Sequence, residues 1–347
     1  MFNTEYNILY ALLTSFTITF FIIPKVILFA QRFRLSDRAG ERASHEGSVP
    51  IFGGLAIFIG IIISLLFWTD FSNILFFIIS LLIVFFVGIV DDLLGLSPYK
   101  KLIGQTIAIL IVIYSGSIQI DNMHGVLLVY DLSLFFSTLF TLFVVIVITN
   151  GFNLIDGVDG LASGIGVISS LFFGLIAFIM NQTDMAIIAF SLMGSLMAFL
   201  RYNFNPAKIF MGDTGSLVVG MILLVLAINL IQHGFSYDTI NYENKGPLMA
   251  IVFLSLPLFD SLRVFIVRAS KGIGPLSAGR DHIHHALLDL GLGHKKTAII
   301  LYLISLLLII ISCFLIDMNL NLAILILSTI SYILLIIPFY LLRRKKQ

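Results

Sequence analysis

The chain has 347 residues, of which 59% are hydrophobic and only 11% are charged. A soluble globular domain carries about 25% charged residues, so this composition excludes an ordinary soluble protein and predicts an integral membrane protein. The net charge of +1 gives no sign of a nucleic-acid partner, and we expect none. The one cysteine, Cys313, lies in an apolar run, which excludes a disulfide framework and a thiolate metal site.

Apolar segments recur along the whole chain. A spanning helix needs roughly 20 mostly apolar residues, and by that measure we predict eleven helices. They lie near residues 7–30, 51–68, 72–90, 103–119, 133–150, 162–180, 184–200, 214–233, 247–268, 297–316 and 321–342. We therefore expect an all-α integral membrane protein, a polytopic bundle of about eleven transmembrane helices that forms one domain over residues 1–347. The long connection at 118–130 is suited to a small hairpin.

Lys and Arg are distributed very unevenly between the two sets of connecting loops. Eighteen of the 20 basic residues lie in one set, which includes the carboxyl-terminal tail. Because basic residues concentrate on the cytoplasmic side of a membrane, we predict that these loops and the carboxyl terminus are cytoplasmic and that the amino terminus lies outside. All the unusual polar clusters fall in this cytoplasmic set.

The first cluster is the adjacent pair Asp91 and Asp92, followed by Lys101. Neighbouring carboxylates repel each other unless a cation or a basic group intervenes, which suggests Mg²⁺. A solvated helix end is the plainer interpretation of the pair alone.

The second cluster is the run 150–161, which is rich in Asn, Asp and Gly. Asp156 and Asp159 are three residues apart, so a helical turn would bring both to one face. Asn150 and Asn153 have the same spacing, and their amides are able to bind the edge of a base or a sugar. A polar turn explains one Asn-Gly pair but explains the whole run poorly.

The third cluster is the segment 201–216, in which glycines flank Asp213. Thr214 is suited to the role of helix N-cap. The start of a helix is also a place where backbone N–H groups bind phosphate oxygens, and Asp213 would then hold a metal ion that bridges them.

The fourth cluster is Arg280-Asp-His282-Ile-His284-His285, in the longest predicted cytoplasmic loop. No cysteine or fourth nearby ligand completes a tetrahedral zinc site. Arginine and histidine next to carboxylates are better suited to phosphate binding and proton handling. Together the four clusters predict phosphoryl transfer between one soluble and one lipid-borne reactant, which depends mainly on positioning and on charge neutralisation.

With all four clusters in order, the chain resembles the polyprenyl-phosphate N-acetylhexosamine-1-phosphate transferase family, from about Asp37 to His285. The resemblance implies an enzyme that takes a UDP-N-acetylhexosamine, requires Mg²⁺ or in its place Mn²⁺, and uses undecaprenyl phosphate in the cell membrane. Its products would be UMP and a polyprenyl-diphosphate sugar. A homodimer is compatible with this expectation.

The resemblance also carries roles to single positions. It implies metal binding or activation of the lipid phosphate by Asp91 and Asp92, and Mg²⁺ coordination by Asp213 with Asp156. It implies contacts with the nucleotide or sugar by Asn153, Asp159, Asn203 and Phe210, and a basic contact by Lys101. His282, His284 and His285 would contact the diphosphate or the sugar, with Asn150 and Arg280 completing the substrate-binding set.

Two branches of the family differ in the histidine motif. The branch acting on UDP-MurNAc-pentapeptide has three consecutive histidines, whereas His-Ile-His-His is similar to the branch that transfers GlcNAc-1-phosphate. We therefore expect an initiating enzyme of O-antigen, common-antigen, teichoic-acid or capsule assembly, with the pentapeptide branch as the alternative. Two departures are the loop 37–45, which lacks the family's Pro-Asn and one Lys, and Gly279, where the family often has Asp.

Other classes of protein fit the sequence less well. An ion-coupled transporter would carry its acidic groups within the membrane and show paired broken helices, whereas these carboxylates gather at one face. A CDP-alcohol phosphotransferase would continue its Asp-Gly motif into Ala-Arg, whereas Gly160 is followed by Leu-Ala-Ser. A catalytically inactive scaffold would not need the full acidic set.

Overall fold

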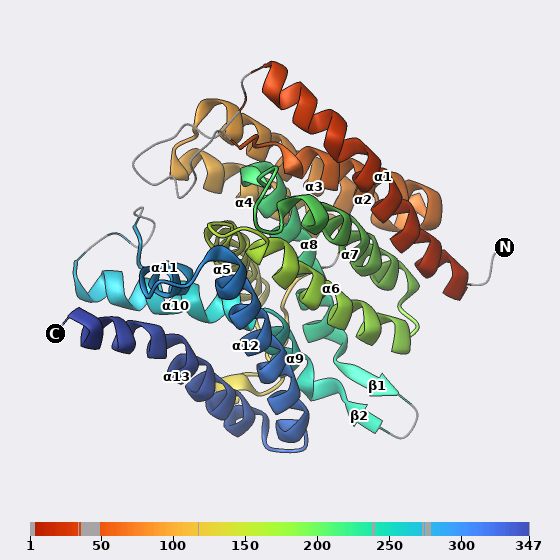
Figure 1. The fold of residues 1–347 in the computed structure, drawn as a ribbon. Helices are drawn as coiled ribbons and strands as arrows, with labels where there is room; N and C mark the ends of the chain where they lie inside the picture. Colours follow the sequence, from red (N-terminus) through yellow and green to blue (C-terminus); the bar gives the residue numbers. More distant parts are fainter. Residues whose placement is uncertain are drawn as a thin grey trace.

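The computed structural model describes residues 4–33, 35, 49–116, 118–237, 240–272, 274 and 279–346. The predicted loop between Asp37 and His45 lies outside the described residues. The helices are α1 (Thr4–Arg32), α2 (Gly53–Trp68), α3 (Phe71–Leu94), α4 (Pro98–Gly116), α5 (Leu134–Ile155), α6 (Leu161–Ile179), α7 (Thr183–Asn203), α8 (Gly212–His233), α9 (Gly246–Phe253), α10 (Ser255–Ser270), α11 (Ile283–Asp289), α12 (His294–Leu315) and α13 (Leu320–Lys346). Short 3₁₀ turns, η1 (Val126–Leu128) and η2 (Glu243–Lys245), and two strands, β1 (Phe235–Tyr237) and β2 (Ile240–Tyr242), complete the described elements (Figure 1).

The predicted class, a multi-pass helical membrane protein, is confirmed. Each of the eleven predicted apolar segments coincides with a helix or a pair of helices. Within the described ranges, eight helices are long and apolar enough to cross a membrane, and nine when the bent pair α9–α10 counts as one span. The helix α2 is shorter, at 16 residues, and α4 is not among these candidates. The count of eleven spans therefore stays a prediction.

The segment 247–268, predicted as one helix, is two helices that meet at an angle of 72°. Pro257 has no N–H and cannot donate to the carbonyl of Phe253 four residues earlier, so α9 ends there. The Phe253 carbonyl instead accepts a hydrogen bond from Ser169 Oγ of α6 at 2.7 Å. Proline is tolerated in the first turn of the new helix α10.

Antiparallel backbone pairing occurs both in the predicted connection at 118–130 and in a second connection after α8. The antiparallel pair β1–β2 forms after α8, with Phe235 opposite Tyr242. In the connection at 118–130, Asn122 and Asp131 form an antiparallel β-bridge, and Met123 N donates to the carbonyl of Tyr130 at 2.9 Å.

Helix α8 lies at the centre of the bundle, with α1 and α13 on opposite flanks (Figure 1). It packs against α2, α3, α5, α6, α7 and α9. Its sequence is apolar on every side, and such a helix is stable only when it is buried all round. Glycines allow close approach near its start: a Cβ at Gly88 of α3 would lie 2.8 Å from Thr214 N, and one at Gly54 of α2 would overlap the backbone of Gly215. The first turn of α8 is therefore held rigidly.

Candidate active site

The four predicted clusters meet at one end of the bundle, around the first turn of α8. Asp92 of α3 bonds to this turn, and Lys101 of α4 and Asn153 of α5 both contact Asp213. The loop after α5 touches the histidine motif, because a Cβ at Gly157 would lie 2.7 Å from His284 Nε2. The prediction that the clusters share one face of the protein is confirmed.

The adjacent carboxylates of Asp91 and Asp92 have different partners. Asp91 stands near the end of α3, where Gly95 takes the left-handed φ of 69°. Its Oδ1 accepts a hydrogen bond from Leu96 N at 2.6 Å, and its Oδ2 lies 2.6 Å from Lys101 Nζ. Asp91 is therefore the member of the pair that shares a basic partner with the rest of the site.

Asp92 caps helix α8. Its Oδ1 accepts from Asp213 N at 2.8 Å, and its Oδ2 accepts from Thr214 N at 3.0 Å and from Thr214 Oγ1 at 2.5 Å. The first N–H groups of a helix have no partner within it. A negative carboxylate at this end of a helix also interacts favourably with the helix dipole. Two interpretations of this segment need correction: Met211, not Thr214, is the N-cap residue, and the N–H groups of Asp213 and Thr214 are bonded to Asp92 rather than open to phosphate.

Replacing Asp92 with Ala should mainly lower stability. Three donors at the start of α8 lose their acceptor, and loss of a helix cap costs about 1–2 kcal/mol. A thermal unfolding series in detergent would show a lower melting temperature for Asp92→Ala than for Asp91→Asn, which removes a charge without removing a cap. Equal melting temperatures for the two variants would contradict the capping role.

Asp213 stands at the start of α8 with two partners on its carboxylate. Its Oδ2 forms an ion pair with Lys101, which also pairs with Asp91. Its Oδ1 accepts a hydrogen bond from Asn153 Nδ2 at 2.6 Å, and the same Asn153 amide donates to Ser216 Oγ at 2.9 Å. The structure thus brings Asn153 to the acidic centre, where it orients Asp213. Its predicted contact with the nucleotide stays a prediction.

Asp156 lies in the loop between α5 and α6 with excess negative charge around it. Burial raises its pKa well above the ordinary value, and the charges of Asp213, Asp92 and Asp159 raise it further. Lys101 forms its ion pairs with Asp91 and Asp213. A further positive charge near Asp156 and Asp213 would relieve the repulsion.

The predicted metal set fits a hard cation by its chemistry, because carboxylate oxygens are the ligands that Mg²⁺ prefers. The set is gathered but not arranged as a ligand shell. In the described ranges no group of three His, Cys, Asp or Glu side chains is placed to hold a metal ion. Lys101 lies between Asp91 and Asp213 at the point where a shared cation would lie.

A cavity of about 220 Å³ connects the second and fourth clusters. Its lining residues are Asn153, Leu154, Asp156, Gly157, Gly279, Arg280, His282, His284 and His285. The structure therefore brings the predicted Asp156, Asn153, Arg280 and the three histidines to one space. Asn150 and Phe210 do not line it: Asn150 Nδ2 donates to Gln105 Oε1 at 3.2 Å, and the backbone of Phe210 pairs with Pro50.

Two of the three histidines in the motif, His284 and His285, have lowered pKa values. Burial lowers the pKa of His284 to about 3, with a further contribution from the neighbouring His285. Burial and the charge of Arg280 also lower the pKa of His285. At neutral pH both rings are uncharged, so they offer one N–H donor and one acceptor each rather than a positive charge. In this cavity the positive charge comes from Arg280, which pairs loosely with Asp289 at 3.4 Å.

Asp159 and Asn203 position the loop 204–211. Asp159 accepts hydrogen bonds from Asn205 Nδ2 at 2.9 Å and from Ala207 N at 3.1 Å, and its carboxylate lies 3.3 Å from His294 Nδ1. Asn203 accepts from Gly160 N at 3.0 Å and donates to the carbonyl of Ile209 at 2.9 Å. Both side chains are buried. Their polar atoms bond within the protein, and direct contact with a nucleotide stays a prediction.

Acid should remove the contribution of Asp159 to stability. Burial alone would raise the pKa of Asp159, but hydrogen bonds from His294, Asn205 and Ala207 outweigh burial and lower it from 3.8 to about 2. A lowered folded-state pKa gives stability that is present above about pH 4 and is lost as the pH falls towards about 2, here about 2 kcal/mol. Melting temperatures of the wild type and Asp159→Asn should converge over that window. A constant difference would contradict the ion-pair role.

Sequence reasoning missed Asp260 of α10. Its Oδ2 lies 2.8 Å from His282 Nδ1, and its Oδ1 accepts hydrogen bonds from Ile283 N at 3.1 Å and from Arg263 Nη2 at 3.2 Å. A carboxylate within an apolar segment is costly unless it is paired. Asp260 and Arg263, three residues apart in the segment 247–268, were the signal that could have identified this pair.

The family follows from the comparison with known proteins. The model of glycosyl transferase family 4 matches residues 74–231, which include the Asp91–Asp92 pair and Asp213. A probable undecaprenyl-phosphate N-acetylglucosaminyl 1-phosphate transferase of Bacillus subtilis is 30% identical over 304 residues, 86% of this chain and 82% of the relative. The chain belongs to glycosyl transferase family 4. The predicted resemblance is thus confirmed.

Two further relatives carry names that correspond to the two branches. The undecaprenyl-phosphate alpha-N-acetylglucosaminyl 1-phosphate transferase of Escherichia coli O157:H7 is 26% identical over 304 residues, 84% of this chain and 80% of the relative. The phospho-N-acetylmuramoyl-pentapeptide-transferase of Listeria welshimeri is 42% identical, but over 142 residues, 41% of this chain and 40% of the relative. The similarity to the second branch is therefore higher but confined to a shorter part of the chain.

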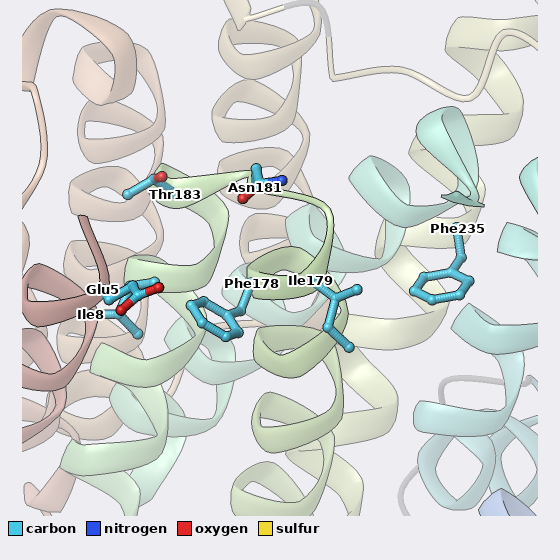
Figure 2. Close-up of a pocket in the computed structure, with 7 residues that line it drawn as sticks. All are labelled: Glu5, Ile8, Phe178, Ile179, Asn181, Thr183 and Phe235. Carbon is cyan, nitrogen blue, oxygen red and sulfur yellow. The ribbon is translucent and has the colours of Figure 1, made fainter. Parts of the chain in front are cut away.

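A larger pocket of about 560 Å³ lies at the other end of helix α6 (Figure 2). Figure 2 shows its lining side chains around the turn between α6 and α7: Glu5, Ile8, Phe178, Ile179, Asn181, Thr183 and Phe235. With 19 residues, α6 separates this pocket from the acidic centre by roughly 28 Å. The described residues that line it include one carboxylate, Glu5, and no basic group.

Proposed function

We propose that the protein transfers N-acetylhexosamine-1-phosphate, with GlcNAc as the sugar, from the UDP-sugar to undecaprenyl phosphate. The products are UMP and undecaprenyl-diphosphate-GlcNAc, and the reaction initiates a cell-envelope polysaccharide. The observation that carries this proposal is the relationship to the Bacillus subtilis transferase over 86% of the chain. The convergence of Asp91, Lys101 and Asp213 at one end of the bundle supports it.

The choice of GlcNAc over MurNAc-pentapeptide rests on the extent of the similarity and on the histidine motif. Relatives named for GlcNAc-1-phosphate transfer align with most of this chain, whereas the pentapeptide transferase aligns with 41% of it. The motif His282-Ile-His284-His285 supports the same branch. These relatives give no support to an ion-coupled transporter.

The proposed reaction is one displacement at the sugar-linked phosphorus. An oxygen of the lipid phosphate forms the new P–O bond, the bond from this phosphorus to the bridging oxygen breaks, and UMP leaves with that oxygen. Asp91 is placed to accept a proton from the lipid phosphate, whose second pKa of about 6 makes strong assistance unnecessary. Lys101 holds the carboxylates of Asp91 and Asp213 close together, and Asn153 orients Asp213. The neutral histidines and Arg280 bind the sugar and the diphosphate.

We propose that Asp213 and Asp156 hold Mg²⁺, or Mn²⁺ in its place, which leaves Asp91 as the acceptor of the lipid proton. A bound divalent ion would neutralise charge on the diphosphate. The excess negative charge around Asp156 supports this assignment. A two-step route through an aspartyl-phosphate intermediate is the chemical alternative, and release of UMP without lipid acceptor would favour it over the single displacement.

We further propose that the site faces the cytoplasm, with the amino terminus outside and the carboxyl terminus inside. Eighteen of the 20 basic residues lie in the loops of the same set as the active site, which supports this orientation. UDP-sugars are cytoplasmic metabolites, so the proposed function requires the same side.

The test is an assay with purified protein, undecaprenyl phosphate, Mg²⁺ and a panel of UDP-N-acetylhexosamines, in which UMP release is followed. We expect release with UDP-GlcNAc that depends on both the lipid and the metal. The absence of release with every sugar would refute the proposal. Release only with UDP-MurNAc-pentapeptide would replace it with the alternative branch.

A further inference from the structure

The Asp260 carboxylate bonds to His282, one of the residues that line the cavity of about 220 Å³. It is completely buried, and its Oδ2 lies 2.8 Å from His282 Nδ1. The same carboxylate accepts a hydrogen bond from Ile283 N, the first N–H of helix α11, at 3.1 Å. It therefore fixes the histidine ring and the helix that carries the rest of the motif. The proposed reaction so far gives Asp260 no task.

The charge of Asp260 is balanced by a second partner. Arg263 Nη2 lies 3.2 Å from Asp260 Oδ1, and Arg263 also donates to the carbonyl of Asp281 and lies 4.1 Å from the Phe339 ring centroid. Arg263 therefore supplies a positive charge beside the Asp260 carboxylate. A carboxylate has no proton to donate, so in the neutral form of the His282 ring Nδ1 carries the hydrogen.

The other nitrogen of His282 is left for a ligand. Nε2 is buried, has no hydrogen-bond partner among the described residues, and belongs to a side chain that lines the cavity. With the proton on Nδ1, Nε2 carries a lone pair and accepts hydrogen bonds. A phosphate oxygen at neutral pH has no proton to donate, whereas a sugar hydroxyl and an acetamido N–H both do.

We infer that Asp260 is a positioning residue that fixes the tautomer of His282, so that Nε2 accepts a hydrogen bond from a hydroxyl or amide N–H of the N-acetylhexosamine. This inference rests on the proposed function and names the residues that recognise the sugar part of its donor. Arg280, which lines the same cavity, is then the group that binds the diphosphate.

A double-mutant cycle tests this at about pH 8, with undecaprenyl phosphate saturating and UDP-GlcNAc varied. Asp260→Asn keeps the size of the side chain but replaces one carboxylate oxygen with an NH₂ donor. This NH₂ group then faces another N–H, either at His282 Nδ1 or at Ile283 N. We expect KM for UDP-GlcNAc to rise about 10- to 100-fold, by analogy with the partners that orient a metal-ligating histidine, with a smaller change in kcat. In the His282→Gln background there is no histidine tautomer to fix, so Asp260→Asn should raise KM for UDP-GlcNAc by less than about twofold.

The matched control is Asp317→Asn, between α12 and α13, which removes an exposed carboxylate away from the cavity and should leave KM within about twofold. If the two substitutions raise KM by factors that multiply in the double variant, the inference is overturned. An Asp260 with a merely structural role would have the same effect with any residue at position 282. If Asp260→Asn does not fold, the variants His282→Gln and His282→Asn are compared instead. The Gln side chain places its amide near the position of Nε2, whereas the Asn side chain does not reach it. A lower KM for UDP-GlcNAc in His282→Asn than in His282→Gln overturns the inference. An inactive wild type refutes the proposed function itself, whereas an active wild type with multiplicative losses refutes only the role of Asp260.

Discussion

Replacing Asp213 with Asn is expected to abolish transfer while leaving the protein folded. The amide has the size of the carboxylate and still accepts the hydrogen bond from Asn153, but it cannot pair with Lys101 or hold a divalent cation. Loss of charge at the proposed metal centre should reduce kcat about 10³-fold, about 4 kcal/mol in activation free energy. Initial rates of UMP release with UDP-GlcNAc and undecaprenyl phosphate measure the loss, and the melting temperature reports the fold.

The matched control for this variant is Asp317→Asn. Asp317 is exposed, bonds to Tyr242 Oη at 2.6 Å, and lies between α12 and α13. Because α12 starts beside Asp159 and has 22 residues, Asp317 is roughly 33 Å from the acidic centre. Its loss should leave the rate unchanged. A rate for Asp213→Asn within about tenfold of the wild type, in a folded protein, would remove Asp213 from the catalytic centre.

Replacing Lys101 with Met should reduce turnover about 10²-fold. Lys101 is the cation between Asp91 and Asp213, and removing one partner of a partly buried charge group leaves the others repelling each other. Lys101→Arg should retain an intermediate rate, because a planar guanidinium does not reproduce the position of a point charge. Steady-state rates for the three proteins at one Mg²⁺ concentration make the comparison.

The adjacent Lys100 provides the control for this pair of variants. It is exposed, so Lys100→Met removes the same charge from the same turn of α4 without touching either carboxylate. Its rate should stay close to that of the wild type. Equal losses for the two methionine variants would indicate a general effect of charge near the membrane surface rather than a specific bridge.

The features that were predictable from the sequence depend on local patterns. Long apolar segments predict helices without reference to distant residues, and the alternation of basic loops placed all four clusters on one face. The partners within the site were not predictable in this way. Asp91 and Asp92 are identical in type, but successive residues on a helix point about 100° apart. One therefore meets Lys101 and the other caps a helix that begins 120 residues later in the chain.

Residues predicted to contact substrate but found holding the chain together illustrate the same limit. Asn203 and Asp159 have the residue types of a nucleotide pocket, yet their partners Gly160 and Ala207 come close only after helices α6 and α7 have packed. Asp260 carried a usable signal, a paired charge in an apolar segment. Its partner His282 lies 22 residues away, across a connection whose path no local pattern specifies.

The most direct test of the central claim follows the two phosphates of the donor separately. UDP-GlcNAc labelled only on the sugar-linked phosphate would be incubated with undecaprenyl phosphate, Mg²⁺ and the purified protein, and the lipid and aqueous products would be separated. Transfer of the sugar-1-phosphate predicts that the label enters the lipid in equal amount to unlabelled UMP. Label that remains in the aqueous phase as UDP, with sugar alone on the lipid, would contradict the account.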